Sequence, residues 1–167
     1  MSINVSTLAL HSRSSRKVTG EPYLRFQVTA GMVAVLSMRQ VQEVRILPAH
    51  RLTPMPNMPA PVLGLMNHRS RVRWVLDIAQ LLGLAPLESN QQQYELLLLQ
   101  MNTIALGLAV QRIESTTWFP ASTMQPLPEE IPPALVPYLQ GCVVQEQSVL
   151  WVLNPEAIVH LAMQLCE

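Results

Sequence analysis

The chain has 167 residues, of which 49% are hydrophobic and 13% are charged, and its 11 basic and 11 acidic residues leave no net charge. This composition excludes a globally disordered chain and allows a sizeable core, in one domain or in two small lobes. The even charge balance argues against a surface built for nucleic acid or anionic lipid, which would carry a basic field.

Residues 1–20 are rich in Ser, Thr and Arg and lack apolar periodicity, so we predict a flexible N-terminal tail. The longest apolar stretch, Ile104–Val110, is far shorter than the ~20 residues that cross a bilayer, and the N-terminus does not resemble a secretory signal. We therefore expect a cytoplasmic protein without direct membrane insertion. Cys142 and Cys166 are too few for a disulfide framework or a metal cluster. We expect Cys142 to be a buried small hydrophobe and Cys166 to be exposed.

The first half of the chain is typical of short β-strands followed by a short helix. Strands are predicted at residues 23–28, 32–36, 38–47, 62–66 and 72–76. The first two form a hairpin around Gly31, and the prolines between 48 and 61 predict a loop or a sheet edge. A helix begins after Asp77, which we expect to be its N-cap, with Gln80 completing a capping box and Gly83 ending the helix.

The second half repeats this order. Strands are predicted at residues 94–101, 104–110, 113–119, 138–144 and 148–153. The first pair turns at Asn102 and Thr103, and a second proline-rich loop runs from 126 to 137. The last helix is expected to start at Asn154, with Pro155 in the favoured first position.

Two tryptophans mark an internal duplication. Gly64 precedes Trp74 by ten residues, and Gly141 precedes Trp151 by the same interval. Each tryptophan begins a Trp-Val-Leu-Asp or Trp-Val-Leu-Asn sequence directly before a predicted helix. We interpret the two halves as copies that build two small antiparallel β-barrels, with both tryptophans in the core.

The residues that usually carry catalysis are few and scattered. Asp77 is the single aspartate, and no glycine-rich phosphate loop or nucleophile motif is present. The four histidines show no ligand spacing: His11, His50, His68 and His160. We therefore predict a binding protein without metal or cofactor rather than an enzyme.

Several short segments, in a fixed order, resemble the CheW-like domain. They are Tyr-Leu-Arg-Phe-Gln-Val at 23–28, Val-Gln-Glu-Val at 41–44, Pro-Ala-Pro-Val-Leu-Gly at 59–64, Asn-His-Arg-Ser at 67–70, Leu-Asp-Ile at 76–78 and Tyr-Leu-Gln-Gly at 138–141. The resemblance covers roughly residues 23–162. It implies a mainly β fold in which residues 21–167 form two interleaved, five-stranded SH3-like barrels that share a core, with short helices.

By this resemblance the protein is a non-catalytic adaptor that couples chemoreceptor-like sensors to a CheA-type histidine kinase. The groove between the barrels would take the tip of a methyl-accepting receptor, and the candidate receptor-binding residues are Val41, Glu43, Val44 and Arg69. A second surface would bind the regulatory domain of the kinase. The protein would then be recruited to receptor arrays at the membrane. Asn-His-Arg-Ser replaces the family's Asn-Leu-Arg-Gly, which suits a divergent system controlling gliding, twitching or phototaxis.

The residues themselves leave some interpretations open. Arg69, Arg71 and Arg73 alternate, so in a strand they would share one face, which is either solvated or, at Arg69, part of a receptor contact. Val41 and Val44 would lie on opposite faces of a regular strand, one in the core and one lining the groove.

Two further choices concern single residues and the class of protein. Glu43 is either an ordinary exposed residue or half of a polar contact, and His68 is expected at the surface or in a turn. The alternative to an adaptor is a small β-barrel that binds nucleic acid, which would need exposed aromatic residues among basic ones.

Overall fold

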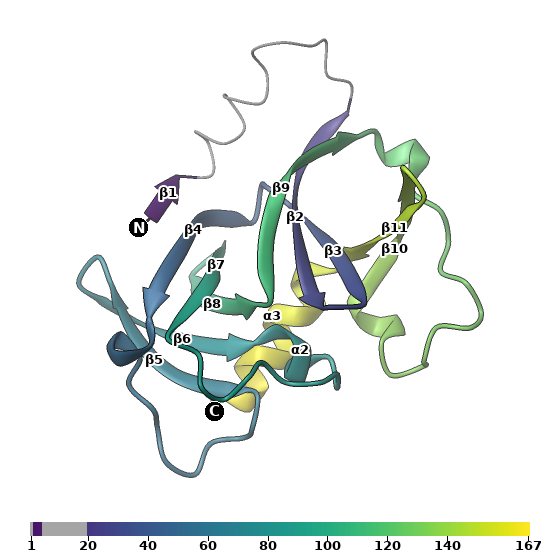
Figure 1. The fold of residues 1–167 in the computed structure, drawn as a ribbon. Helices are drawn as coiled ribbons and strands as arrows, with labels where there is room; N and C mark the ends of the chain where they lie inside the picture. Colours follow the sequence, from purple (N-terminus) through teal and green to yellow (C-terminus); the bar gives the residue numbers. More distant parts are fainter. Residues whose placement is uncertain (1, 5–19) are drawn as a thin grey trace.

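The computed structural model describes residues 2–4 and 20–167 and is built mainly from β-strands (Figure 1). The strands are β1 (Ser2–Asn4), β2 (Glu21–Thr29), β3 (Met32–Ser37), β4 (Val41–Pro48), β5 (Val62–His68), β6 (Arg71–Asp77), β7 (Gln93–Met101), β8 (Ile104–Val110), β9 (Arg112–Phe119), β10 (Leu139–Gln145) and β11 (Ser148–Leu153). The helices are α2 (Ile78–Leu81) and α3 (Pro155–Leu165), with 3-10 turns at Ala49–Arg51, Ala121–Thr123 and Val136–Tyr138.

The strands form two sheets, which we call barrel A and barrel B. Barrel A consists of β4 to β8, in the order β4-β7-β8-β6-β5, and β1 adds to its β4 edge. Barrel B has the order β10-β11-β3-β2-β9. Each sheet curls until a single bridge joins its edges, Thr53 to Leu65 in barrel A and Gln125 to Cys142 in barrel B. The predicted mainly β fold with two five-stranded lobes is confirmed.

The two barrels and the two sequence halves are different divisions of the chain. Barrel A takes β4, β5 and β6 from the first half and the hairpin β7–β8 from the second. Barrel B takes the hairpin β2–β3 from the first half and β9 to β11 from the second. The lobes are thus interleaved, as the family resemblance implies.

Apolar side chains fill three cores: one inside each barrel and a larger one between the barrels. Alternate residues of β7 face different cores, since Leu96 and Leu98 lie inside barrel A whereas Leu97 and Leu99 lie in the shared core. All four leucines are at most 2% exposed. A strand buried on both faces explains this uninterrupted run of leucines.

The two glycines of the duplication occupy matching places. Gly64 and Gly141 each follow a register shift in their hairpin. A Cβ atom would lie 2.3 Å from the Thr53 carbonyl oxygen at Gly64 and 2.6 Å from the Gln125 carbonyl oxygen at Gly141. At each position the backbone of a neighbouring segment, at Thr53 or at Gln125, leaves no room for a side chain, so glycine is required. Each glycine's strand leads to the strand that carries a tryptophan, Trp74 in β6 or Trp151 in β11. Both tryptophans pack against the shared core but are only partly buried, so the prediction that they are core residues holds in part.

The short helix α2 has the predicted N-cap residue, but the predicted capping box does not form. Asp77 is the N-cap, and its Oδ1 accepts a hydrogen bond from the Ala79 backbone N–H at 3.0 Å. Gln80 does not complete a capping box, because its Nε2 donates to the Asp77 carboxylate and the Asp77 backbone N–H is bonded to the Pro61 carbonyl. Gly83, with φ of 77°, ends the helix as predicted.

The long helix α3 confirms the predicted cap. Asn154 is its N-cap, Pro155 occupies the first position, and the Asn154 Oδ1 accepts from the Ala157 backbone N–H. Ile158 packs in the shared core, as does Ile78 of α2, so both helices cover the seam between the barrels (Figure 1).

Three residues of the segment expected as a tail form β1, which pairs antiparallel with β4. Residues 1 and 5–19 of that tail lie outside the described residues. Cys142 is buried as expected, whereas Cys166 is half-buried rather than exposed, and its burial raises the pKa of the thiol. Within the described ranges no helix is long and apolar enough to cross a membrane.

Candidate functional site

A polar cluster at one end of barrel A contains two of the predicted receptor-binding residues. Glu43 is in β4, His68 is the last residue of β5, and Arg69 begins the turn into β6. β4 and β5 are the two edge strands of barrel A, so the cluster joins the edges at this end. We call these three residues the Glu43 cluster.

The carboxylate of Glu43 is almost completely buried. Its Oε2 lies 2.9 Å from His68 Nε2 and 3.4 Å from Arg69 Nη2. The side chains of Glu43 and His68 are 4% and 3% exposed, whereas that of Arg69 is 66% exposed. A buried carboxylate needs such partners, because burial without hydrogen bonds is costly. The cluster therefore presents one exposed guanidinium group that is held from beneath.

Arg69 lies in a tight turn and not in a strand. Arg69 and Ser70 have φ of 52° and 63°, and the flanking residues His68 and Arg71 are paired across β5 and β6. Positive φ at both central residues defines a type I′ turn. The prediction that Arg69, Arg71 and Arg73 share one strand face is wrong, because the turn takes Arg69 out of the alternation.

Val41 and Val44, the two apolar candidates, are both 4% exposed and both pack in the shared core. The expectation of opposite faces fails because the pairing with β7 shifts register between Val41 and Glu43. An extra residue in a strand reverses the inward and outward alternation beyond it. Neither valine side chain lines an open surface. Of the four predicted residues, the structure brings Glu43 and Arg69 into contact and buries both valines in the shared core.

His68 is the member of the cluster that the sequence reasoning placed wrongly. It is buried, not at the surface or in a turn. The available signal was strand alternation, since Met66 points into barrel A and His68 follows two residues later on the same face. The contact with Glu43 spans 25 residues of sequence, and no local pattern shows it.

β1 lies against this part of β4. Its register places Asn4 opposite Glu43, Ile3 opposite Val44 and Ser2 opposite Arg45. In the described ranges no group of three or more His, Cys, Asp or Glu residues is placed to hold a metal ion. An exposed cation held over a buried polar contact is suited to binding a charged partner.

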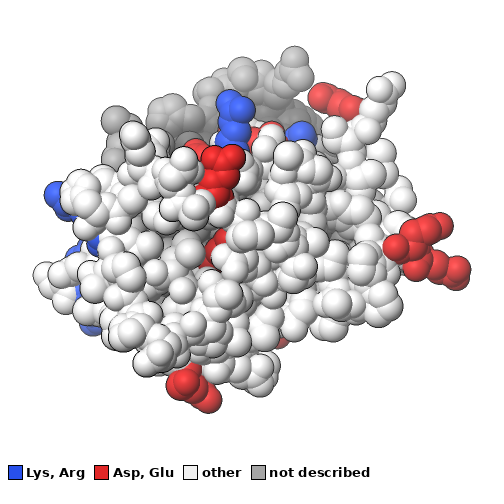
Figure 2. Space-filling view, turned by 60° about the horizontal axis from the view of Figure 1, so that its bottom comes forward, with Lys and Arg blue, Asp and Glu red and all other residues white. Residues whose placement is uncertain are grey.

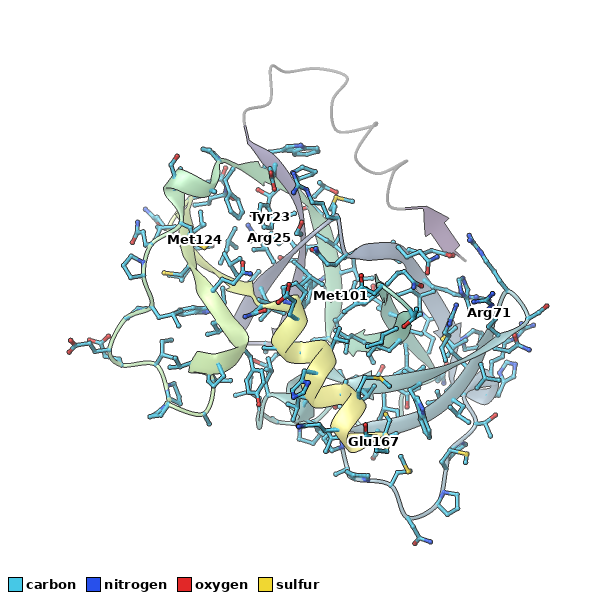
Figure 3. All side chains as sticks on the ribbon, turned by 180° about the vertical axis from the view of Figure 1, so that it is seen from behind. Tyr23, Arg25, Arg71, Met101, Met124 and Glu167 are labelled. Carbon is cyan, nitrogen blue, oxygen red and sulfur yellow. The ribbon has the colours of Figure 1, made fainter. Side chains whose placement is uncertain are left out.

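Charges are divided between the two barrels. Figure 2 shows basic side chains at the margin on the side of barrel A and acidic ones at the margin on the side of barrel B, with further acidic side chains at the centre and bottom of this face. In Figure 3, Arg71 lies at the outer edge of barrel A, while Tyr23 and Arg25 lie in barrel B. Burial raises the pKa of Tyr23, whose ring stacks on Phe119 at 4.1 Å.

Barrel B carries an ion pair of its own on the outer face of β2 and β9. Arg25 Nε donates to Glu114 Oε1 at 2.7 Å, and Gln27 Nε2 donates to the other carboxylate oxygen at 3.2 Å. The Arg25 hydrogen bond holds the pKa of Glu114 below its ordinary value of 4.5, although partial burial opposes the shift. Both side chains are 25% exposed, so this is a surface feature of the sheet.

The described residues thus form two interleaved, five-stranded β-barrels with a polar cluster at one end. The CheW-like domain family matches residues 22–163. Protein PilI of Pseudomonas aeruginosa is 32% identical over 133 residues, which cover 77% of this chain and 70% of that protein. The scaffolding protein TtCheW from Thermoanaerobacter tengcongensis has the same fold, with a TM-score of 0.70 at 15% identity over 81% of this chain and 90% of that one. The chain belongs to the CheW-like family.

Proposed function

We propose that this protein is a non-catalytic adaptor that couples a chemoreceptor-like sensor to a CheA-type histidine kinase in the control of motility. The observation that carries the proposal is the family match over residues 22–163, which includes both barrels. An adaptor must contact two partners at once, and two barrels with different surface charge offer two distinct binding surfaces. The partners would be the tip of the receptor and the regulatory domain of the kinase.

The likeness to Protein PilI supports a role in pilus-based, twitching motility rather than in phototaxis. The adaptor would work in the cytoplasm and be recruited to receptor arrays at the membrane.

Within this proposal Arg69 makes the direct receptor contact. Its guanidinium group is exposed, and a guanidinium can bind a receptor carboxylate through two parallel hydrogen bonds. Val41, Glu43 and Val44 are buried and would support the contact from behind. This division of roles differs from the prediction, which placed one of the two valines in the groove together with Glu43 and Arg69.

The test is a titration of purified protein against a receptor-tip fragment and a kinase regulatory fragment separately. Arg69→Glu places like charge against the receptor's carboxylates, so receptor affinity should fall at least tenfold. Kinase affinity should stay near wild type, whereas the unfolding midpoint should fall, because the variant replaces a cationic partner of the buried Glu43 carboxylate with a like charge.

Glu146→Lys is the matched control. Glu146 begins the turn between β10 and β11 in barrel B, with φ of 47°, and its side chain is not part of the Glu43 cluster. This variant should leave receptor affinity unchanged. Wild-type protein that binds neither fragment would refute the adaptor function, and equal effects of the two variants would refute the assignment of the receptor contact to Arg69.

A further inference from the structure

The Glu43 carboxylate is too deeply buried to contact a partner, yet it touches the one exposed charge of the cluster. Oε2 of Glu43 is shared by His68 Nε2 and Arg69 Nη2. The His68 contact, at 2.9 Å, is the shorter of the two, and both of its side chains are buried. His68 therefore fixes the position of the oxygen against which Arg69 rests.

We infer that His68 is a positioning residue for the receptor contact: it holds Glu43, and Glu43 in turn sets the orientation of the Arg69 guanidinium. The inference rests on the proposed function and adds to it a residue that does not touch the receptor. A long arginine side chain loses rotamer freedom when it binds, and a partner that pre-orients it removes part of that cost.

The corresponding turn of barrel B shows that the buried pair is not needed to form the turn. Glu146 and Gln147 have φ of 47° and 68°, the same conformation as Arg69 and Ser70. Gln145, the counterpart of His68, accepts a hydrogen bond from Thr117 Oγ1 at 3.1 Å. Among the described residues no buried ion pair lies beneath that turn. The His68 and Glu43 pair must serve something other than backbone geometry, and Arg69 is the group it contacts.

The turn holds Arg69 in a conformation that few side chains other than glycine, asparagine and aspartate favour. A φ of 52° fixes where the side chain leaves the backbone, and the carboxylate fixes the far end of the same side chain. Two constraints on one flexible side chain give a preorganised binding group.

The experiment compares receptor affinity in a cycle of variants. Removing His68 alone would leave a buried carboxylate short of a partner, so the fold is kept by replacing both members together, as Glu43→Leu with His68→Leu. This double variant should bind the receptor-tip fragment about fivefold more weakly, and Arg69→Ala about tenfold more weakly. Adding Arg69→Ala to the double variant should cause no loss beyond that of Arg69→Ala alone, because His68 acts only through Arg69.

Two further variants separate positioning from folding. His68→Gln keeps an N–H donor for Glu43, so its receptor affinity should stay within about twofold of wild type. Thr117→Val with Gln145→Leu removes the corresponding contact in barrel B and should leave receptor affinity unchanged. Thermal melts of every variant accompany the titrations.

The outcomes distinguish this inference from the function on which it rests. If wild type does not bind the receptor fragment, the proposed function fails. If wild type binds and Arg69→Ala weakens binding, but the double variant with a normal melt binds like wild type, the positioning role of His68 is refuted. Fully additive losses in the triple variant would also refute it.

Discussion

Barrels A and B share a backbone plan but differ in what they do with polar side chains. The two hairpin turns match position by position when they are counted from Gly64 and Gly141. The matching residues are His68 and Gln145, Arg69 and Glu146, and Ser70 and Gln147. Both turns have the same φ signs. Barrel A ends in a cation over a buried contact between His68 and Glu43, whereas barrel B ends in an anion beside a neutral hydrogen bond. The two turns thus share their backbone geometry and differ in charge.

The opposite ends of the barrels differ as well. Asp77 is fully buried and its carboxylate accepts from the backbone N–H groups of Ala79 and Leu87, so the chain after α2 is tied down. Its counterpart Asn154 caps α3 through one side-chain hydrogen bond. Open pockets lie beside both caps, of about 410 Å³ at Asp77 and about 280 Å³ at Asn154. The two ends therefore differ in how the chain near the cap is held, since only Asp77 also binds the backbone at Leu87.

The largest expected effect comes from filling the two glycine crossings. Gly64→Ala should reduce the free energy of unfolding by about 3 kcal/mol or more, because the added Cβ meets backbone and the φ of 151° is strained for an L-residue. Gly141→Ala lacks the strained φ and should cost less, about 2 kcal/mol. Denaturant unfolding measures both. Gly31→Ala, where nothing lies within 4 Å of the new Cβ, is the control and should change little. Equal effects at Gly31 and Gly64 would contradict the crossing geometry.

A second comparison sets the two helix caps against each other. Asp77→Ala should cost about 3 kcal/mol, since it removes a cap and leaves the Leu87 N–H without its acceptor. Asn154→Ala should cost only about 1 kcal/mol, because it removes one long bond of 3.3 Å. Chemical denaturation of both variants gives the difference. A larger loss at Asn154 would show that the start of α3 depends on its cap more than the one side-chain hydrogen bond indicates.

The two turns should respond alike. Ser70→Gly and Gln147→Gly replace residues with φ of 63° and 68°, where glycine is unstrained, so each should stabilise the fold by about 0.5 kcal/mol after the entropy cost of glycine. Melting temperatures of the two variants are the measurement. A gain at one site and a loss at the other would mean that the turns are not equivalent.

The smallest expected effect is the contribution of Glu114, in barrel B, to the pH dependence of stability. Because the folded pKa of Glu114 lies below its ordinary value, its contribution to stability is present above that value and is lost as pH falls through the lowered pKa. Glu114→Gln should therefore shrink the drop in urea midpoint between pH 7 and the acid range. An unchanged drop would show that the Arg25 pair does not contribute, as is common for surface ion pairs.

Much of the fold was predictable from local patterns. Strand alternation, turn residues and the Asn154-Pro155 start gave the elements, and the repeated Gly-to-Trp spacing gave the duplication. The interleaving of the strands was not in the pattern, because β6 and β11 each pair in parallel with a strand distant in sequence. That arrangement came only from family resemblance.

The candidate site was predicted less well. The register shift after Val41 reverses strand alternation, and nothing in the residue types at 41–44 indicates it. The strands predicted at 62–66 and 72–76 left His68 outside any strand, although only Arg69 and Ser70 form the turn. Buried polar partners far apart in sequence, such as Glu43 and His68, become visible only when the sheet is assembled.

In the sequence, the strands of barrel A lie between the first two and the last three strands of barrel B, and this order has a consequence for folding during synthesis. Barrel A from β4 to β8 is a continuous stretch of chain, whereas the hairpin β2–β3 must wait for β9. The delay from Ser37 to Arg112 is about 75 residues, or about 4 to 15 seconds of synthesis. During that time the apolar face of β2, with Leu24 and Phe26, has only β3 and the growing barrel A to cover it. Barrel A, which carries Arg69, can thus be complete before its neighbour has all its strands.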